Sequence, residues 1–295
     1  MTPLLLLILL GFNGAVYLVL GRIAVTGGAN GLLLALCQAA AGAAVLWPAC
    51  AMRGERLGVD ARTLGFYAGG ALIGIVLPAV AAFAALPHVG AGLMATTIAT
   101  SPVFTTLIAH AAGVERFGLR RGIGVACTFA GAVLIVGGPE ADGQRDPFWL
   151  AVGLLAPFFL ACGNVFRTRF WPRGHSAFQV GAGIGLAGVI VATPLALASG
   201  AVAAVAGLGL APGMALAGFI AVNGLNALPY YRLQQIAGPV YLSLLGHVVA
   251  VFGVLLGALA LGERYGPWEL AGVALVLAGV AAVTRRPGAR KPLTP

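Results

Sequence analysis

Apolar residues gather in long runs along the whole chain, and the short stretches between the runs carry most of the charged residues. A helix needs roughly 20 apolar residues to cross a bilayer core about 30 Å thick, and the runs reach that length. Membrane-spanning β-strands would instead show roughly ten-residue segments of alternating polarity. The pattern therefore predicts an all-α integral membrane protein. Ten transmembrane helices are expected, at residues 3–21, 31–52, 64–85, 89–112, 119–138, 148–169, 176–199, 210–232, 239–261 and 267–284.

The composition agrees with this assignment. Of the 295 residues, 60% are hydrophobic and 8% are charged, whereas soluble domains carry roughly 25% charged residues to face water. The first apolar run has the length of a full crossing and no Lys or Arg before it. A cleaved secretory signal would carry basic residues there, so this run is predicted to be retained as the first helix.

The basic residues predict the orientation in the membrane. Lys and Arg collect on cytoplasmic loops. If the N-terminus is cytoplasmic, three of the 17 Lys and Arg residues fall on the opposite side, namely Arg22, Arg145 and Arg264, and the rest fall inside. Both termini are therefore expected in the cytoplasm. The net charge of +9 is interpreted as this topology signal, and no nucleic-acid partner is expected. The Ala- and Gly-rich composition suits a bacterial inner membrane.

The two halves of the chain resemble each other. A shift of 148 residues places Glu115-Arg116-x-Gly118 on Glu263-Arg264-x-Gly266, and it also places Gly90 on Gly238. We expect repeats at residues 1–142 and 143–295, the second with a short basic tail. Five helices per repeat is an odd number, so the second repeat enters the membrane inverted. Inverted repeats are a transporter architecture, with the substrate site near the bilayer midplane.

The motifs around these repeated positions resemble a known family. They are Ala85-Leu86-Pro87-His88-Val89-Gly90-Ala91, Ser101-Pro102-Val103-Phe104, Val114-Glu115-Arg116, Gly238-Pro239-Val240 and Gly262-Glu263-Arg264. Together they are similar to EamA-type proteins of the drug/metabolite transporter superfamily. The resemblance implies ten helices, cytoplasmic termini and export of amino acids or related metabolites. It also implies a cavity lined mainly by helices 1, 3, 4, 6, 8 and 9.

Polar residues within the predicted spans are the candidates for a site. Asparagine is costly in hydrocarbon without a partner, so the asparagines are expected either to bond neighbouring helices or to line a cavity. His247 is the one ionisable side chain in the middle of a span, and it either binds substrate or bonds a neighbouring helix. Tyr230 and Tyr231 are expected in the interfacial aromatic belt. The candidate substrate-binding residues are Asn13, Tyr17, Pro78, Ala99, Asn164, Asn226, Ser243 and His247.

Two further features bear on the chemistry. Pro78 falls on Asn226 under the repeat shift, and corresponding helix interruptions point to a midplane site; fixed kinks are the alternative. Glu263 is expected to act structurally, since a carboxylate near the start of a helix is favoured by the helix dipole.

Mid-span Asp, Glu and Lys are absent, which favours a neutral or zwitterionic substrate. The leading hypothesis is a secondary transporter that exports such metabolites, amino acids first, by alternating access. A passive channel or uniporter, or drug efflux on the same fold, are the alternatives. The sequence shows no ATP-binding motif, no metal or redox spacing of its four cysteines, and no cofactor or enzyme motif. A small solute and the lipid bilayer are the expected partners; flux direction, ion coupling and oligomeric state stay open.

Overall fold

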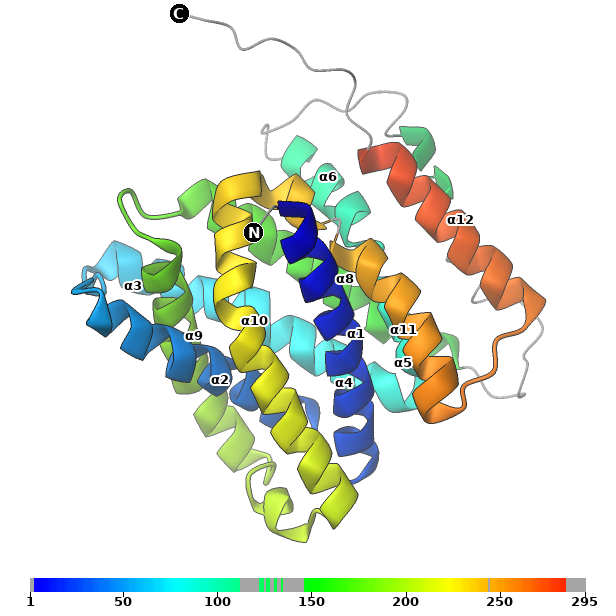
Figure 1. Ribbon diagram of the computed structural model, residues 1–295, viewed down its shortest axis with the longest axis horizontal. Coiled ribbons are helices and arrows are strands. Elements are labelled where there is room, and N and C mark those ends of the chain that lie inside the picture. Colours follow the sequence, from blue (N-terminus) through cyan, green and yellow to red (C-terminus); the bar gives the residue numbers. More distant parts are fainter. Residues whose placement is uncertain are drawn as a thin grey trace, which may run out of the picture.

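The computed structural model describes residues 3–111, 122–124, 126–127, 130–131, 134, 146–243 and 245–284. Throughout these ranges the ordered elements are helices, and none is a strand (Figure 1). Seven helical segments of the described chain are long and apolar enough to cross a membrane, and Leu245–Leu261 and Leu270–Gly279 are shorter apolar helices. The prediction of an all-α integral membrane protein is confirmed. The count of ten stays a prediction, because most of the expected span 119–138 lies outside the described residues.

Several helices lie close to their expected ranges. These are α1 (Pro3–Thr26), α2 (Gly31–Met52), α8 (Pro147–Phe170), α9 (Ala177–Ala198) and α12 (Pro267–Thr284). The starts of α2, α8 and α9 carry side chains that accept the free backbone N–H groups of the first turn. Asn30 accepts from Leu33 N at 3.0 Å, and Ser176 forms a capping box with Gln179 at the start of α9. Polar residues between the apolar runs therefore set where these helices begin.

The third crossing is continuous but irregular. It consists of α3 (Ala61–Ala71), a π-helical turn at Leu72–Val76 and α4 (Leu77–Val89). Pro78 follows the π turn directly. Because proline has no N–H, the carbonyl four residues earlier, that of Gly74, loses its helical partner. Such π turns are frequent at functional sites, and this one faces the cavity described below.

The fourth crossing is interrupted, where one helix was expected at 89–112. It forms α5 (Ala91–Ile98) and α6 (Ser101–Ala111), and the break precedes Pro102. The hydroxyls of Thr97 and Thr100 donate to carbonyls one turn back, to Met94 O at 2.8 Å and to Thr97 O at 2.6 Å. These bonds stabilise the backbone at the break.

The expected boundary between the eighth and ninth spans is wrong. Spans were expected at residues 210–232 and 239–261, but α10 (Leu210–Ser243) continues through Pro239, and α11 (Leu245–Leu261) follows. Leu242 is 2% exposed and packs against the leucines at the start of α1. Burial of this apolar end keeps the chain helical past the proline, because tertiary packing overrides local propensity. A short 3₁₀ helix, Ala203–Gly207, lies between α9 and α10.

Helices far apart in the sequence form the centre of the bundle. The helix α1 packs against both α10 and α11, and α2 packs against both α9 and α10. In addition, α4 packs against α8, and α5 against α11. Figure 1 shows α1 in dark blue beside α10 in yellow. A cavity lies between α1, α2, α4, α8, α10 and α11.

Candidate functional site

A cavity of about 210 Å³ lies between these central helices. Most of its lining is apolar, from residues such as Leu10, Ile75, Leu160 and Val249. Ligand sites are commonly built in this way, with an apolar wall and a few placed polar groups. The polar side chains on the lining are Tyr17, Gln38, Arg167, Asn223, Asn226, Tyr230 and Tyr231.

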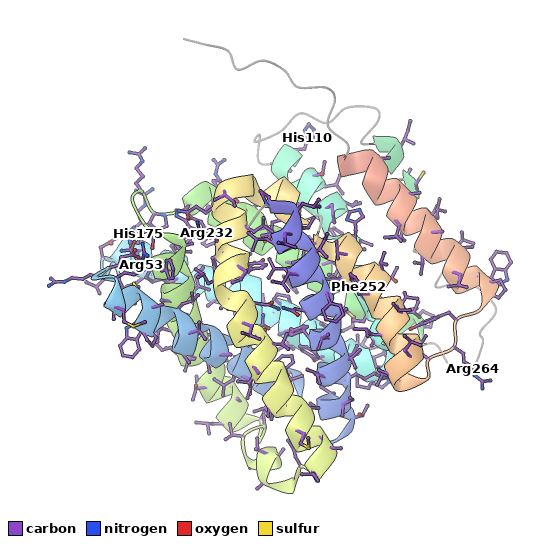
Figure 2. All side chains as sticks on the ribbon, viewed as in Figure 1. Arg53, His110, His175, Arg232, Phe252 and Arg264 are labelled. Atoms are coloured by element: carbon purple, nitrogen blue, oxygen red, sulfur yellow. The ribbon has the colours of Figure 1, made fainter. Side chains whose placement is uncertain are left out.

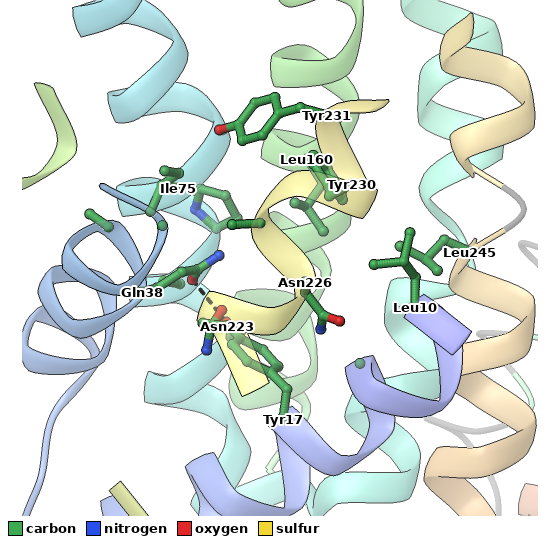
Figure 3. A pocket seen from close by; sticks show the side chains of 18 of the residues that line it. Leu10, Tyr17, Gln38, Ile75, Leu160, Asn223, Asn226, Tyr230, Tyr231 and Leu245 are labelled. Carbon is green, nitrogen blue, oxygen red and sulfur yellow. Dashed lines mark hydrogen bonds between the residues drawn. The ribbon is translucent and has the colours of Figure 1, made fainter. Parts of the chain in front are cut away.

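Tyr17 lines one end of the cavity and packs against two buried aromatic rings. Its hydroxyl donates to Gln38 Oε1 at 3.1 Å, which joins α1 to α2 (Figure 3). Its ring stacks on Phe219 with centroids 4.7 Å apart and meets Phe83 edge-on at 5.3 Å. Phe83 and Phe219 are fully buried. Packing therefore fixes the ring of Tyr17, and its hydroxyl lies on the cavity wall.

Two asparagines join α1 to α10 beside Tyr17. Asn13 Nδ2 donates to Asn226 Oδ1 at 2.9 Å, and Asn226 lines the cavity. One turn earlier on α10, Asn223 Nδ2 donates to Phe219 O at 2.7 Å. Each amide thus has a partner, and the amides of Asn223 and Asn226 also reach the cavity (Figure 3).

The other end of the cavity holds a buried arginine. Arg167, in the last turn of α8, is 1% exposed. Its Nε donates to Gln234 Oε1 at 3.0 Å, and its Nη2 donates to Asn164 Oδ1 at 2.6 Å and to Tyr230 Oη at 2.9 Å. Tyr230 Oη also donates to Asn164 Oδ1 at 3.2 Å. The network links α8 to α10 around a positive charge.

The structure corrects the sequence interpretation at three residues. The charge pattern counted Arg167 among the cytoplasmic basic residues and gave it no part in the site, and Tyr230 and Tyr231 were expected in the interfacial belt. In the structure all three line the cavity. A signal existed: Arg167 follows Asn164 by three residues, so both lie on one helix face. An inward-facing asparagine therefore implied an inward-facing arginine.

The structure brings together part of the candidate set. Tyr17, Pro78 and Asn226 line the cavity. Asn13 and Asn164 each bond a lining residue.

The remaining candidates lie elsewhere. Ala99 is fully buried in a separate core cluster, and its neighbour Ile98 lines the cavity instead. His247 lies partly buried on α11, whereas the lining of that region comes from Leu245 and Val249. Ser243 is the last residue of α10, and its side chain lies outside the described part of the structure.

Glu263 is the centre of a contact at the end of the bundle where α1 ends. Its carboxylate pairs with the Arg22 guanidinium and accepts a hydrogen bond from the Tyr265 hydroxyl. It also accepts from Ala91 N at 2.6 Å and Gly92 N at 3.0 Å. The carboxylate thus caps α5, where the sequence led us to expect the start of the next helix. In the folded chain the N–H groups at the start of α5 lie within hydrogen-bond distance of the Glu263 carboxylate. The corresponding pair at Glu115 lies outside the described residues.

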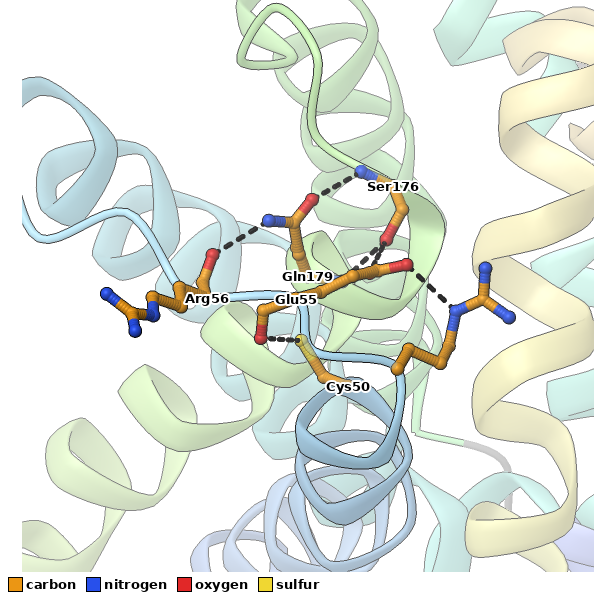
Figure 4. Close-up of polar contacts among 6 residues, drawn as sticks. Cys50, Glu55, Arg56, Ser176 and Gln179 are labelled. Atoms are coloured by element: carbon orange, nitrogen blue, oxygen red, sulfur yellow. Dashed lines mark hydrogen bonds and ion pairs between the residues drawn. The ribbon is translucent and has the colours of Figure 1, made fainter.

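A second carboxylate joins the α2–α3 connection to the start of α9 (Figure 4). Glu55 accepts a hydrogen bond from the Ser176 hydroxyl and pairs with Arg53 at 2.8 Å. In the same cluster Gln179 Nε2 donates to Arg56 O at 2.7 Å. The hydrogen bond from Ser176, together with the one from Arg53, lowers the pKa of Glu55 below its ordinary value. The carboxylate is therefore charged at neutral pH and holds the loop against α9.

The model of the EamA-like transporter family matches residues 1–137. This match is consistent with the drug/metabolite transporter superfamily expected from the motifs. Together with the seven helical segments of the described chain that are long and apolar enough to cross a membrane, it supports a multi-pass membrane protein.

The likeness to solved structures extends beyond the part that the EamA model matches. Sixteen chains of solved structures match this one. One of them, described as "Crystal structure of protein", is 18% identical and covers 94% of this chain and 97% of its own, with a TM-score of 0.64. At this identity the likeness establishes a shared fold and no more. No curated protein matches the chain.

Proposed function

We propose that this protein is a secondary transporter that exports small neutral or zwitterionic metabolites, amino acids above all, across a bacterial inner membrane. The observation that carries the proposal is the cavity among the central helices, with Tyr17, Gln38, Asn223 and Asn226 on an apolar wall. Amide and hydroxyl groups of this kind orient a small polar solute by hydrogen bonds. The candidates Asn13, Pro78 and Asn164 belong to the same region through the contacts given above.

The size of the cavity favours a metabolite over a drug. Its volume of about 210 Å³ is below the roughly 300 Å³ at which pockets for drug-sized ligands begin. Drug efflux on the same fold is therefore the weaker alternative. We place the amino-acid side chain against the apolar lining and the polar end of the solute against the amides and Arg167.

Helix pairings support two inverted repeats and alternating access. The contact of α1 with α10 has a counterpart in that of α8 with α4, and the contact of α1 with α11 has one in that of α8 with α6. The helices α2 and α9, and likewise α5 and α11, pair with each other. We propose that the halves rock against each other around the central cavity. The proposed boundary between residues 142 and 143 lies outside the described residues.

The distribution of basic residues supports cytoplasmic termini. Figure 2 shows Arg53, His175 and Arg232 on one side of the bundle and Arg264 on the opposite side. Cytoplasmic loops carry the excess of Lys and Arg. We therefore assign the side of Arg53 and Arg232 to the cytoplasm and the Arg22–Glu263 contact to the opposite face.

Uptake of radiolabelled amino acids into proteoliposomes tests the proposal. We expect saturable uptake of one class of amino acid by the wild type. Tyr17→Phe should raise the KM, because it removes the hydroxyl that donates to Gln38 and retains the stacked ring. Leu4→Ala, at an exposed position of the same helix, is the control and should transport normally. Uptake equal to that of empty liposomes for all amino acids would remove the amino-acid assignment. Uptake that never saturates would favour a passive channel.

A further inference from the structure

We propose that Arg167 binds the carboxylate of the transported solute, so that the cavity selects molecules with one carboxylate and an apolar side chain. The inference rests on the proposed function, and it goes further because it names the chemical group that the solute must carry. The sequence has no Asp, Glu or Lys in the middle of a predicted span, whereas the structure places the charged Arg167 on the cavity wall. Three observations on Arg167 carry the inference: the absence of a counter-charge among the described residues, its unused hydrogen-bond donors, and its bond to Gln234, which lines a second cavity.

The charge of Arg167 has no protein counter-charge in the described structure. Arginine stays protonated in proteins, and burial of an uncompensated charge is costly. The hydrogen-bond acceptors around its guanidinium are neutral: Gln234, Asn164 and Tyr230. The ion pairs among the described residues join Arg22 to Glu263 and Arg53 to Glu55. A solute carboxylate would supply the missing negative charge.

The guanidinium also retains hydrogen-bond donors. A guanidinium has five N–H donors, and the bonds above use the one on Nε and both on Nη2. The Nη1 group donates to no atom of the described protein, although Arg167 lines the cavity. Two charged donors are therefore left at the cavity wall. Charge-assisted bonds from arginine to carboxylate are among the strong hydrogen bonds in proteins.

Two glycines make room for this group. Gly74, in the π turn, has no side chain, and a Cβ there would collide with Nη1 of Arg167. Gly163 lies one turn before Arg167, and a Cβ there would come within 2.8 Å of Gly74 Cα and 3.3 Å of Nη1. The π turn and α8 thus approach closely at the point where the guanidinium reaches the cavity.

The position of Gln234 suggests how an anion reaches the site. Gln234 is 4% exposed, accepts from Arg167 Nε and also lines a second cavity with Arg173 and His175. It therefore separates the central cavity from a basic pocket on the side assigned to the cytoplasm. Positive charge in such a pocket raises the local concentration of anionic groups. A rotation of Gln234 would open a path between the two cavities.

The competing role for Arg167 is a structural link between α8 and α10. Such a link would affect stability, but it would not make binding depend on a carboxylate. The decisive readout is therefore the preference for an acid over its amide. The probes are leucine, 4-methylpentanoate and phenylalanine as acids, and leucinamide, 4-methylpentanamide and phenylalaninamide as the matching amides. Sodium chloride and sodium phosphate serve as inorganic anions.

Binding is measured on purified protein in detergent, by the ligand-dependent shift of the unfolding temperature and by displacement of labelled leucine. We expect the wild type to bind the acids at least about tenfold more tightly than their counterparts. Arg167→Gln should weaken acid binding by at least about tenfold and leave the weak binding of the counterparts unchanged. Arg167→Lys should retain part of the preference. Arg169→Gln, which removes the same charge from an exposed position two residues later, should behave as the wild type.

The outcomes separate this inference from the proposed function. Equal binding of acids and amides by the wild type, an unchanged preference in Arg167→Gln, or no binding of any acid would overturn it. An Arg167-dependent shift with chloride or phosphate alone would show a general anion site and overturn the carboxylate assignment. If Arg167→Gln does not fold, the wild-type comparison of acids with amides decides. An acid preference without flux in proteoliposomes would support the inference and refute transport, whereas saturable flux without an acid preference would do the reverse.

Discussion

The carboxylate of Glu263 pairs with the guanidinium of Arg22, although the two residues lie at opposite ends of the sequence. The same carboxylate accepts the backbone N–H groups of Ala91 and Gly92. One acidic side chain thus joins α1, the start of α5 and the connection between α11 and α12. The side chains of Arg22 and Glu263 are 25% and 10% exposed, so solvent screens the ion pair only partly.

A double-mutant cycle at this pair should show strong coupling. We expect Glu263→Gln and Arg22→Gln each to destabilise the protein by roughly 1–3 kcal/mol, because each change leaves a partly buried group without its partner. The double variant should cost less than the sum of the single changes. Unfolding of the purified proteins at increasing SDS concentration measures the four stabilities. Additive losses would show that the pair contributes no coupling energy.

Variants of the hydrogen-bonded pair Asn13 and Asn226 distinguish a role in helix packing from a role in solute binding. Asn13→Ala and Asn226→Ala should each cost about 1 kcal/mol of stability, the range measured for polar contacts between membrane helices. Only Asn226 lines the cavity, so only Asn226→Ala should also raise the KM for the solute. Proteoliposome kinetics on both variants measures this difference. An equal rise in KM for the two would show that the bond positions the helices rather than the solute.

The glycine of the π turn should be sensitive to a single methyl group. In Gly74→Ala the new Cβ would collide with Arg167 Nη1, and overpacking of this kind costs about 1–3 kcal/mol. We expect loss of acid binding together with a lower unfolding temperature. The matched control is Gly65→Ala on the same crossing, where no atom lies within 4 Å of the added Cβ. It should be neutral or slightly stabilising. Normal acid binding by Gly74→Ala would show that the guanidinium tolerates displacement.

The contact of Glu55 with Ser176 should make stability depend on pH. The pKa of Glu55 is lowered in the folded state, first by the Ser176 hydrogen bond and then by Arg53. A lowered folded-state pKa contributes stability above the ordinary carboxyl pKa of 4.5, and this contribution is lost as the pH falls through the folded-state value. At pH 7 the unfolding temperature of the wild type should therefore exceed that of Glu55→Gln. The two should converge in acid. A difference that stays constant with pH would contradict the account of this contact.

Most of the fold could be predicted from the sequence, because apolar length dominates where a chain crosses a bilayer. The ends of α2, α8 and α9 followed from polar residues between apolar runs. The boundary after α10 could not be predicted in this way, since α10 continues past Pro239 to the buried Leu242.

The site was predicted in part, for equally physical reasons. Asn164 and Asn226 were expected inside because an unpaired amide is costly in hydrocarbon. Arg167 was missed because an arginine near the end of a span also fits the positive-inside pattern. Ala99 shows a different limit. Neighbouring residues on a helix point about 100° apart. The sequence pattern around Ala99 did not show that Ile98, and not Ala99, lines the cavity.

Counterflow in proteoliposomes tests the central claim most directly. Vesicles are loaded with unlabelled leucine, diluted into a trace of labelled leucine and followed over time. Alternating access around the central cavity predicts that labelled leucine accumulates transiently above its external concentration, because outward movement of unlabelled solute returns carriers to bind label. Tyr17→Phe should reduce this overshoot, and Leu4→Ala should not. Simple equilibration without an overshoot, or uptake no greater than in empty vesicles, would contradict the account.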